Sequence, residues 1–248
     1  MKRICRYTKR YWQSTKSMAD LYYDLHIHSC LSPCADDLMS PNNIVNMAMI
    51  KELDVIAVSD HNSVLQQDTM DQVAKTLGMT ILYGIEVETR EEIHVLAIFR
   101  HLEDVKAMGA YVSERLPGLP NNPDFFGKQE IKDVNDETTG VYDILLLQSI
   151  DADLNEVVDK IHAFHGKAIL AHIYDRLNSI HNQLGFIPFD LDYDAVEVKN
   201  EEEKEKFIRQ YKSKKPVFMN SDAHYLTDIK ERERGMDEQK FREFFGLW

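Results

Sequence analysis

The sequence predicts an α/β fold in which crossover helices cover a single sheet, with closure into a barrel as the expected form. Seven short apolar runs alternate with stretches of helical character, and most of the runs are apolar on both faces. Parallel strands covered by helices have this pattern. The expected strands are 21–27, 54–58, 80–87, 93–99, 167–171, 194–198 and 216–219. Strand–helix alternation at this count is typical of α/β barrels.

The helical stretches lie between these strands and at the end of the chain, at 41–52, 66–77, 102–115, 152–165, 201–213 and 236–246. The first begins with Ser40 and Pro41, an N-cap residue followed by proline at the first helical position. Residues 116–149 fit the alternation poorly, because they open with the Pro-, Gly- and Asn-rich sequence LPGLPNNPDFFG. We interpret them as an insertion, with a lid as one role, in a single domain over residues 18–248.

Composition excludes several classes of protein. The chain has 248 residues, 44% of them hydrophobic, and its 29 Lys+Arg against 42 Asp+Glu give a net charge of −13. Binders of duplex DNA or anionic membranes rely on a basic surface, which this chain lacks in bulk. No apolar run is long enough to span a bilayer, and three cysteines are too few and odd in number for a disulfide framework. We expect a cytoplasmic protein with no membrane partner.

Residues 1–17 differ from the rest, since they hold six basic residues and no acidic one. They lack the continuous apolar segment of a secretory signal. We expect a basic, disordered extension, or a true start at Met18, because recognisable structure begins only at Leu21. A tail that binds nucleic acid or lipid headgroups is the alternative.

Metal-ligand residues recur at the ends of the expected strands. His26 and His28 are two apart on one strand, so both side chains share a face, as two ligands of one metal do. Other strands end with or carry a histidine or a carboxylate: Asp60, His61, Glu86, His94, His172, Asp222 and His224. Carboxyl ends of strands are where α/β barrels build their sites. This donor set predicts zinc, manganese or iron.

The loop after the first strand adds further candidates. Asp36 and Asp37 could fold back over the site, whereas we expect Cys30 and Cys34 to be free thiols rather than ligands. The remaining histidines have no partner at ligand spacing and are expected to be surface or structural residues: His101, His162, His165 and His181.

These motifs resemble the PHP superfamily, named for polymerase and histidinol phosphatase, and in particular its small stand-alone bacterial metal-dependent phosphoesterases. The resemblance spans residues 24–224 and rests on DLHIHS (24–29), Asp36, SDH (59–61), GIE (84–86), LAH (170–172) and SDAH (221–224). It implies a distorted (β/α)7 barrel with two or three divalent metal ions at the carboxyl ends of the strands.

The resemblance also implies three ligand sets. His26 and His28 would bind a first metal with Asp222. Glu86 would bridge it to a second, which His94 and His172 also hold, and a third would take Asp36, His61 and His224. The chain departs from the family pattern at Ile173, where proline is common, and at Asn220, where glycine is common. It also has Ala35-Asp36-Asp37 where Ser-Asp-Gly is common, so the choice of Asp36 over Asp37 rests on its distance to Pro41.

Such a cluster predicts hydrolysis of a phosphomonoester of a small molecule, a nucleotide or phosphorylated metabolite, by a metal-activated water. Arg176 is the candidate phosphate clamp, with an ordinary solvated arginine as the alternative. Asp60 is expected either to orient a ligand or to take protons from the water. Glu197 is expected to face a helix. Substrate choice is expected to reside in the loops 116–149 and 173–190.

Three other functions compete. A PHP-type nuclease trimming short oligonucleotides would need stacking aromatics and cations along a groove, for which Phe125, Phe126, Lys128, Arg115 and the basic tail are candidates. A non-enzymatic scaffold is disfavoured because a structural site needs only four closed ligands. A metal-dependent amidohydrolase also begins with HxH, but it would typically finish with a lone Asp rather than with Asp222-Ala223-His224.

Overall fold

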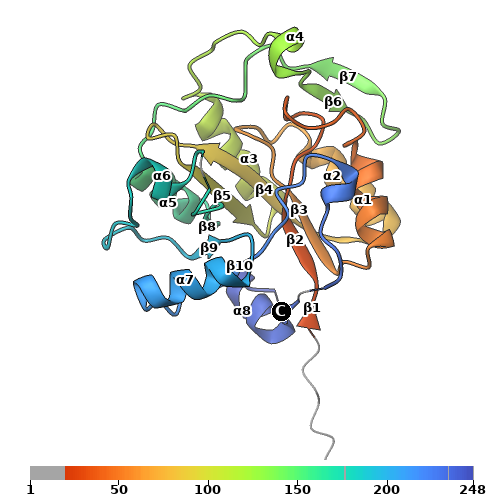
Figure 1. Ribbon diagram of the computed structural model, residues 1–248. Helices are drawn as coiled ribbons and strands as arrows, with labels where there is room; N and C mark the ends of the chain where they lie inside the picture. The colour runs from red at the N-terminus through yellow and green to blue at the C-terminus, as the bar shows by residue number, and fades with distance from the viewer. Residues whose placement is uncertain (1–19, 176, 234, 248) are drawn as a thin grey trace, which may run out of the picture.

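The computed structural model describes residues 20–175, 177–233 and 235–247, and residues 1–17 lie outside this range. A seven-stranded sheet with the order β10-β9-β8-β5-β4-β3-β2 forms its centre (Figure 1). The strands are β2 (Tyr23–Ile27), β3 (Val55–Val58), β4 (Thr80–Glu88), β5 (His94–Phe99), β8 (Lys167–Leu170), β9 (Ala195–Glu197) and β10 (Val217–Phe218). They coincide with the seven apolar runs, which confirms the predicted α/β class.

One strand, β5, departs from the expected pattern, in which crossover helices connect parallel strands throughout the sheet. β4 and β5 form an antiparallel pair in which Glu88 lies opposite His94, and β5 is also antiparallel to β8. The connection, residues 89–93, is too short for a crossover, which needs a dozen or more residues. Because β5 runs in the opposite direction, its first residue, His94, lies at the edge of the sheet that holds the carboxyl ends of the other strands.

The sheet closes at that same edge. Ala223, beyond β10, forms a parallel bridge with Ile27 at the end of β2. The His28 N–H donates to the Ala223 carbonyl at 2.9 Å, and the Ala223 N–H donates to the His26 carbonyl at 3.1 Å. These bonds join the segment after β10 to the end of β2 and bring the two edges of the curled sheet together, as in a distorted (β/α)7 barrel. At the opposite end β1 (Asp20–Leu21) pairs with β11 (Met236–Asp237) in a small separate sheet.

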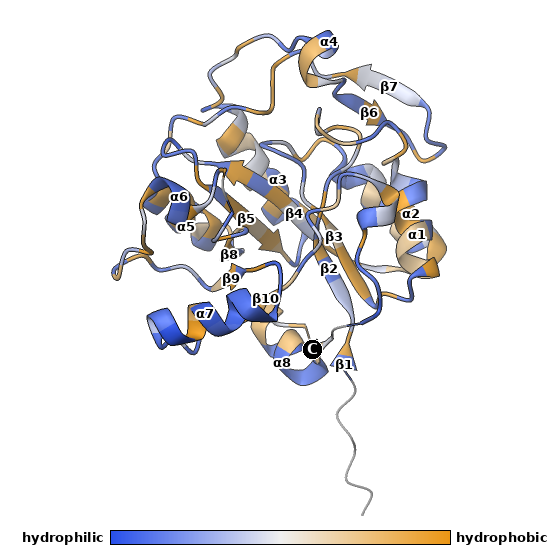
Figure 2. Ribbon diagram, in the orientation of Figure 1, coloured by the Kyte–Doolittle hydropathy of each residue, from blue (hydrophilic) through white to orange (hydrophobic). Residues whose placement is uncertain are grey.

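Helices pack around the barrel and close its amino end. The longer ones are α1 (Pro41–Ile50), α2 (Gln67–Leu77), α3 (Leu102–Ser113), α5 (Leu154–Ala163), α7 (Glu201–Tyr211) and α8 (Glu238–Phe245). The sheet strands are largely hydrophobic, whereas α7 is mostly hydrophilic (Figure 2). Phe241 and Phe245 of α8 join an apolar cluster with Leu25 and Leu96 of the sheet. No described helix has both the length and the apolar character needed to cross a membrane.

Residues 116–149 contain short elements outside the central sheet: α4 (Pro123–Phe126) and a hairpin of β6 (Glu130–Lys132) and β7 (Thr138–Val141). They lie above the barrel in Figure 1. The Glu130 N–H donates to the Cys30 carbonyl at 3.0 Å, and the Gln66 amide bonds both the N–H and the carbonyl of Lys132. The segment is thereby fixed to the loops that follow β2 and β3. The remaining short helices are α6 (Ile180–Gln183) and η1 (Leu226–Asp228).

Candidate metal centre

His26 and His28 point to a common space, as their spacing predicts. Both side chains are fully buried, and their Nε2 atoms lie 3.2 Å apart. Asp222 reaches the same space from the segment after β10, with its Oδ1 at 3.4 Å from His26 Nε2 and 3.2 Å from His28 Nε2. The three ligand atoms are close enough for one ion to contact all of them.

Glu86, on β4, occupies the middle of the cluster. Its Oε1 lies 2.9 Å from His94 Nδ1, 3.2 Å from His172 Nε2 and 3.2 Å from His26 Nε2. Its Oε2 lies 3.0 Å from His61 Nδ1. One carboxylate therefore touches residues of all three predicted ligand sets, which is the position of a bridging ligand.

Of the third predicted ligand set, Asp36, His61 and His224, the structure brings only the two histidines together. His61 and His224 each stack on the ring of His28 with centroids 4.4 Å apart, and the ligand atoms of all three histidines are grouped. The Asp36 carboxylate instead accepts the Leu38 N–H at 2.9 Å and belongs to none of the ligand groups among the described residues. Cys34, from the same loop, lines the cavity beside His61 and His224.

Glu197 is a residue whose role the sequence reasoning missed. It is buried, and both its oxygens lie 3.1 Å from His26 Nδ1. It also accepts the His172 N–H at 3.1 Å and the Asn220 side-chain amide at 2.7 Å. A carboxylate on the far nitrogen of a histidine fixes the ring and raises its basicity as a ligand. The expectation that Glu197 faces a helix is therefore wrong, and the signal was an acidic residue inside an apolar strand.

Ser32 and Asp60 orient His28 in a similar way. Ser32 Oγ donates to Asp60 Oδ1 at 2.7 Å, so its lone pair is available to the Nδ1–H of His28, 3.0 Å away. The other ring nitrogen of His28 then presents its lone pair to the cluster. Asp60 also accepts the N–H and the hydroxyl of Ser29, both at 2.7 Å. It is buried and does not line the cavity, so its contacts are those of a positioning residue.

Two ligand candidates have left-handed backbones that non-glycine residues rarely adopt, His172 with φ 28° and Asp222 with φ 54°. Such conformations cost about 1–3 kcal/mol each and cluster at functional sites. The neighbouring segment is held by Asp24, which accepts both the N–H and the hydroxyl of Ser221. The backbone strain is thus supported by a buried carboxylate on β2.

The pKa values of the cluster shift in both directions. Burial opposes protonation of His26 and His61, yet the negative groups beside them raise both pKa values well above the usual value. Burial and the charge of His61 lower the pKa of His28 to about 3, which leaves a neutral imidazole. Burial opposes ionisation of Glu86, yet the charges of His94 and His26 hold its pKa well below the usual range. Burial would likewise raise the pKa of Cys34, but interactions with His61 and His224 lower it to about 6.

The donor chemistry fits bound metal ions. Glu86 Oε2 is buried and, although it lies 3.0 Å from His61 Nδ1, it makes no hydrogen bond of good geometry. Imidazole nitrogens face each other at 3.2 Å between His26 and His28 and at 3.3 Å between His94 and His172. Lone pairs crowded in this way are stabilised by a shared cation. Imidazole and carboxylate ligands suit zinc, manganese and iron, and Glu197, Ser32 and Asp60 complete the outer contacts.

The cluster opens into a cavity of about 440 Å³. Its other walls are Leu147, from the 116–149 segment, and Asp175, Leu177 and Asn178, from the loop after β8. The Asn178 amide lies 2.8 Å from His94 Nε2. Arg176, the predicted phosphate clamp, lies outside the described residues.

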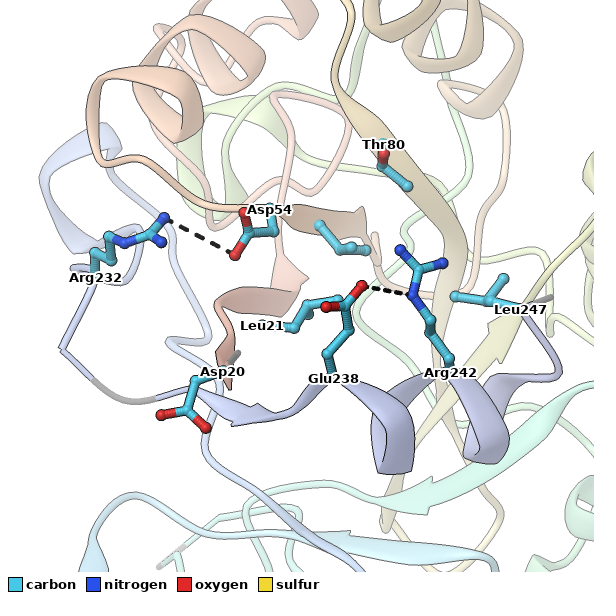
Figure 3. A pocket seen from close by; sticks show the side chains of 9 residues that line it. Asp20, Leu21, Asp54, Thr80, Arg232, Glu238, Arg242 and Leu247 are labelled. Carbon is cyan, nitrogen blue, oxygen red and sulfur yellow. Dashed lines mark hydrogen bonds and ion pairs between the residues drawn. The ribbon is translucent and has the colours of Figure 1, made fainter. Parts of the chain in front are cut away.

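A second hollow lies at the amino ends of β3 and β4 (Figure 3). Its two arginines are paired with carboxylates: Arg232 with Asp54 at 3.9 Å, and Arg242 with Glu238 at 2.8 Å. It holds no group of metal-ligand residues within the described part of the chain.

Comparison with known proteins agrees with this geometry. The PHP domain family model matches residues 24–211. A 5'-3' exoribonuclease of Haemophilus influenzae is 33% identical over 79 residues, which cover 31% of this chain and 28% of that enzyme. An uncharacterized protein of Methanocaldococcus jannaschii is 26% identical over 185 residues, or 71% of this chain and 80% of that protein.

Solved structures share the fold. A lesion-specific endonuclease from Pyrococcus furiosus has a TM-score of 0.65 at 18% identity, over 93% of this chain and 57% of that one. A candidate metal-dependent phosphoesterase from Bifidobacterium adolescentis has a TM-score of 0.61 at 16% identity, over 91% and 96% of the two chains. The chain spans just over half of the endonuclease. Because the family model matches most of its length, the chain belongs to the PHP domain family.

Proposed function

We propose that this chain hydrolyses a phosphomonoester of a small molecule, a nucleotide or a phosphorylated metabolite, with two or three bound divalent ions. The observation that carries the proposal is the cavity over the cluster. Its volume of about 440 Å³ falls within the range for small-ligand sites, about 300–1,000 Å³. Leu147 and Leu177 give it apolar walls, while the ligand residues form a polar floor.

The chain's own residues would hold the ions and position the substrate. Divalent ions, when bound, supply Lewis acidity and lower the pKa of a water molecule. His26, His28 and Asp222 would hold one of them, and Glu86 would link it to a second ion at His94 and His172. The orientation of these imidazoles depends on Glu197 and Ser32, because each contacts the Nδ1 of a ligand histidine.

The net charge of −13 makes local cations necessary for an anionic substrate. Lys199 Nζ is bound to Asp175 at 2.7 Å, so its charge is already paired near the cavity. Arg176 follows Asp175 in the chain, and its role as a phosphate clamp is part of the proposal.

A nuclease acting on short oligonucleotides is the second candidate, favoured by the identity to the exoribonuclease. The described residues expected to form its groove, Phe125, Phe126, Lys128 and Arg115, do not line the cavity. Phe125 is 77% exposed on α4, Lys128 lies near Asp37 and Glu130, and Arg115 stacks on Tyr111 at 3.8 Å. This arrangement favours the small-substrate proposal.

A phosphate-release panel tests the two functions side by side. Protein reconstituted with zinc, manganese or iron would be given nucleoside monophosphates, a bisphosphate nucleotide and a short 5'-phosphorylated RNA. We expect release from the monomeric esters, lost in His26→Ala and kept in His101→Ala, since His101 is exposed and does not line the cavity. Degradation of the RNA with no turnover of any monomer would overturn the proposal in favour of the nuclease.

A further inference from the structure

The ring of His94 lies between two carboxylates of the neighbouring strand. Its Nδ1 faces the cluster, 2.9 Å from Glu86 Oε1 and 3.3 Å from His172 Nε2. On the other side of the ring, Glu88 Oε2 lies 3.6 Å from His94 Nε2. Glu88 is directly opposite His94 in the antiparallel pair of β4 and β5. It also shares the cavity-facing side of β4 with Glu86, because residues two apart in a strand point to the same face.

The Glu88 side chain is itself held in place. It is buried, and its Oε1 accepts the hydroxyl of Ser149 at 2.7 Å. The Glu88 backbone N–H donates to the side-chain carbonyl of Asn62 at 3.1 Å, and its backbone carbonyl accepts the Ile150 N–H at 2.9 Å. Because Ser149 occupies one carboxylate oxygen, the other oxygen is the one that faces His94.

The same arrangement occurs around His26. Its Nε2 lies in the cluster, 3.2 Å from Glu86 Oε1, and its Nδ1 lies 3.1 Å from the carboxylate of Glu197. A carboxylate beside the outer nitrogen of a ligand histidine favours the proton there and leaves the lone pair on the inner nitrogen. Glu88 has the corresponding place beside His94, and it belongs to none of the ligand groups among the described residues. Its carboxylate is therefore placed to orient a ligand rather than to bind a metal itself.

A second group faces the same nitrogen of His94. The Asn178 amide nitrogen lies 2.8 Å from His94 Nε2, and the Asn178 carbonyl accepts the His94 N–H at 2.8 Å. An amide N–H that donates to Nε2 favours the proton on Nδ1, and in that tautomer Nδ1 has no lone pair for a cation. The negative charge of Glu88 favours the opposite tautomer. The two neighbours of Nε2 therefore oppose each other.

We propose that Glu88 is a positioning residue for the predicted second ion: its charge keeps the proton of His94 on Nε2 and leaves the Nδ1 lone pair for the metal. The proposal rests on the metal cluster of the proposed function but not on its substrate. Because Ser149 holds Glu88, the 116–149 segment supports the metal centre in addition to forming a wall of the cavity.

Glu88→Gln tests the charge, because glutamine keeps the length of the side chain and an oxygen for Ser149. Metal-free protein would be titrated with Zn²⁺ against a chromophoric chelator, which gives the dissociation constant of each successive ion independently of phosphate release. Asp151→Asn is the matched control, since Asp151 is an exposed carboxylate that pairs with Arg90 at 2.9 Å and does not line the cavity. We expect Glu88→Gln to weaken one ion by about 10–100-fold, with the control equal to the wild type.

Asn178→Asp, added to Glu88→Gln, separates an effect of charge from a structural one. Aspartate tolerates the left-handed backbone of Asn178, φ 50°, and places a carboxylate beside the same Nε2. We expect the double variant to bind the weakened ion more tightly than Glu88→Gln does.

Three results would overturn the positioning role of Glu88: unchanged zinc affinity in Glu88→Gln, equal weakening of every ion, or no recovery in the double variant. In each of these cases, zinc binding and phosphate release by the wild type would leave the proposed function standing. Failure of the wild type to bind more than one ion would instead contradict the second site, and with it the metal cluster of the proposed function.

Discussion

The two ends of the barrel both carry hollows lined by charged residues, yet their chemistry differs. At the amino end, Arg232 and Arg242 face the carboxylates Asp54 and Glu238 on a partly exposed surface (Figure 3). At the carboxyl end, buried histidines face one another, and several of them converge on the carboxylate of Glu86. In the amino-end hollow each arginine is paired with a carboxylate, whereas at the carboxyl end several metal-ligand atoms are crowded into one space.

The difference shows what distinguishes a metal centre from a charged cavity. Exposed ion pairs are stable without a ligand and contribute little, about 0–1 kcal/mol. Buried imidazoles and carboxylates cost free energy unless they are paired or metal-bound, and a cation shared among them would reduce that cost. The outer contacts of Glu197 and Ser32 exist only at this end, and the predictions below compare substitutions there with substitutions at the other end.

The largest effect is expected from Asp222→Asn. Asparagine tolerates the left-handed backbone at this position, so the substitution removes the charge without adding strain. We expect loss of a bound ion and a fall in phosphate release of more than about 10²-fold, beyond what a residue outside the ligand shell produces. Metal analysis and kinetics on the same preparation check this. Wild-type metal content with wild-type turnover would remove Asp222 from the site.

Glu197→Gln should have the next largest effect. Glutamine keeps the shape and the contact with His26 but lowers the basicity of the imidazole. Metal affinity should fall by about 10–100-fold, and saturating metal should restore most of the activity. A metal titration measures this. An unchanged dissociation constant would mean that Glu197 is a structural residue only.

Asp60→Asn separates the two roles that the sequence left open for this residue. Since Asp60 contacts Ser29 and Ser32 rather than the cavity, we expect a loss of about tenfold in metal affinity and an unchanged pH dependence of kcat. Disappearance of the basic or acidic limb of the pH profile at full metal occupancy would instead show that Asp60 transfers a proton.

Arg242→Ala, at the amino end, should have the smallest effect. Its ion pair with Glu238 is about half exposed, so the free energy of unfolding should change by less than about 1 kcal/mol. Metal content and phosphate release should equal those of the wild type. A loss of turnover comparable to that of Glu197→Gln would show that the amino-end hollow takes part in the reaction.

The sequence predicted the strands and most of the cluster because both depend on local pattern. The two-residue spacing of His26 and His28 fixes a shared face, and apolar runs mark the strands. The reversal of β5 depends on the length of one turn, and it is the reason that His94 reaches the cluster from the start of a strand. The position of Glu197 depends on pairing between β9 and its neighbours, which a lone acidic residue in a strand does not specify. The loop with Asp36 and Cys34 is set by contacts to Ser32 and His224, which no periodicity encodes.

The most direct test of the proposed phosphoesterase activity is the metal content of the purified protein, measured together with phosphate release before and after chelation. The cluster predicts two or three divalent ions per chain, loss of hydrolysis when they are removed, and recovery when they are returned. Hydrolysis at the full rate by metal-free protein, or a chain that retains no ion at the carboxyl end of its barrel, would contradict the central claim.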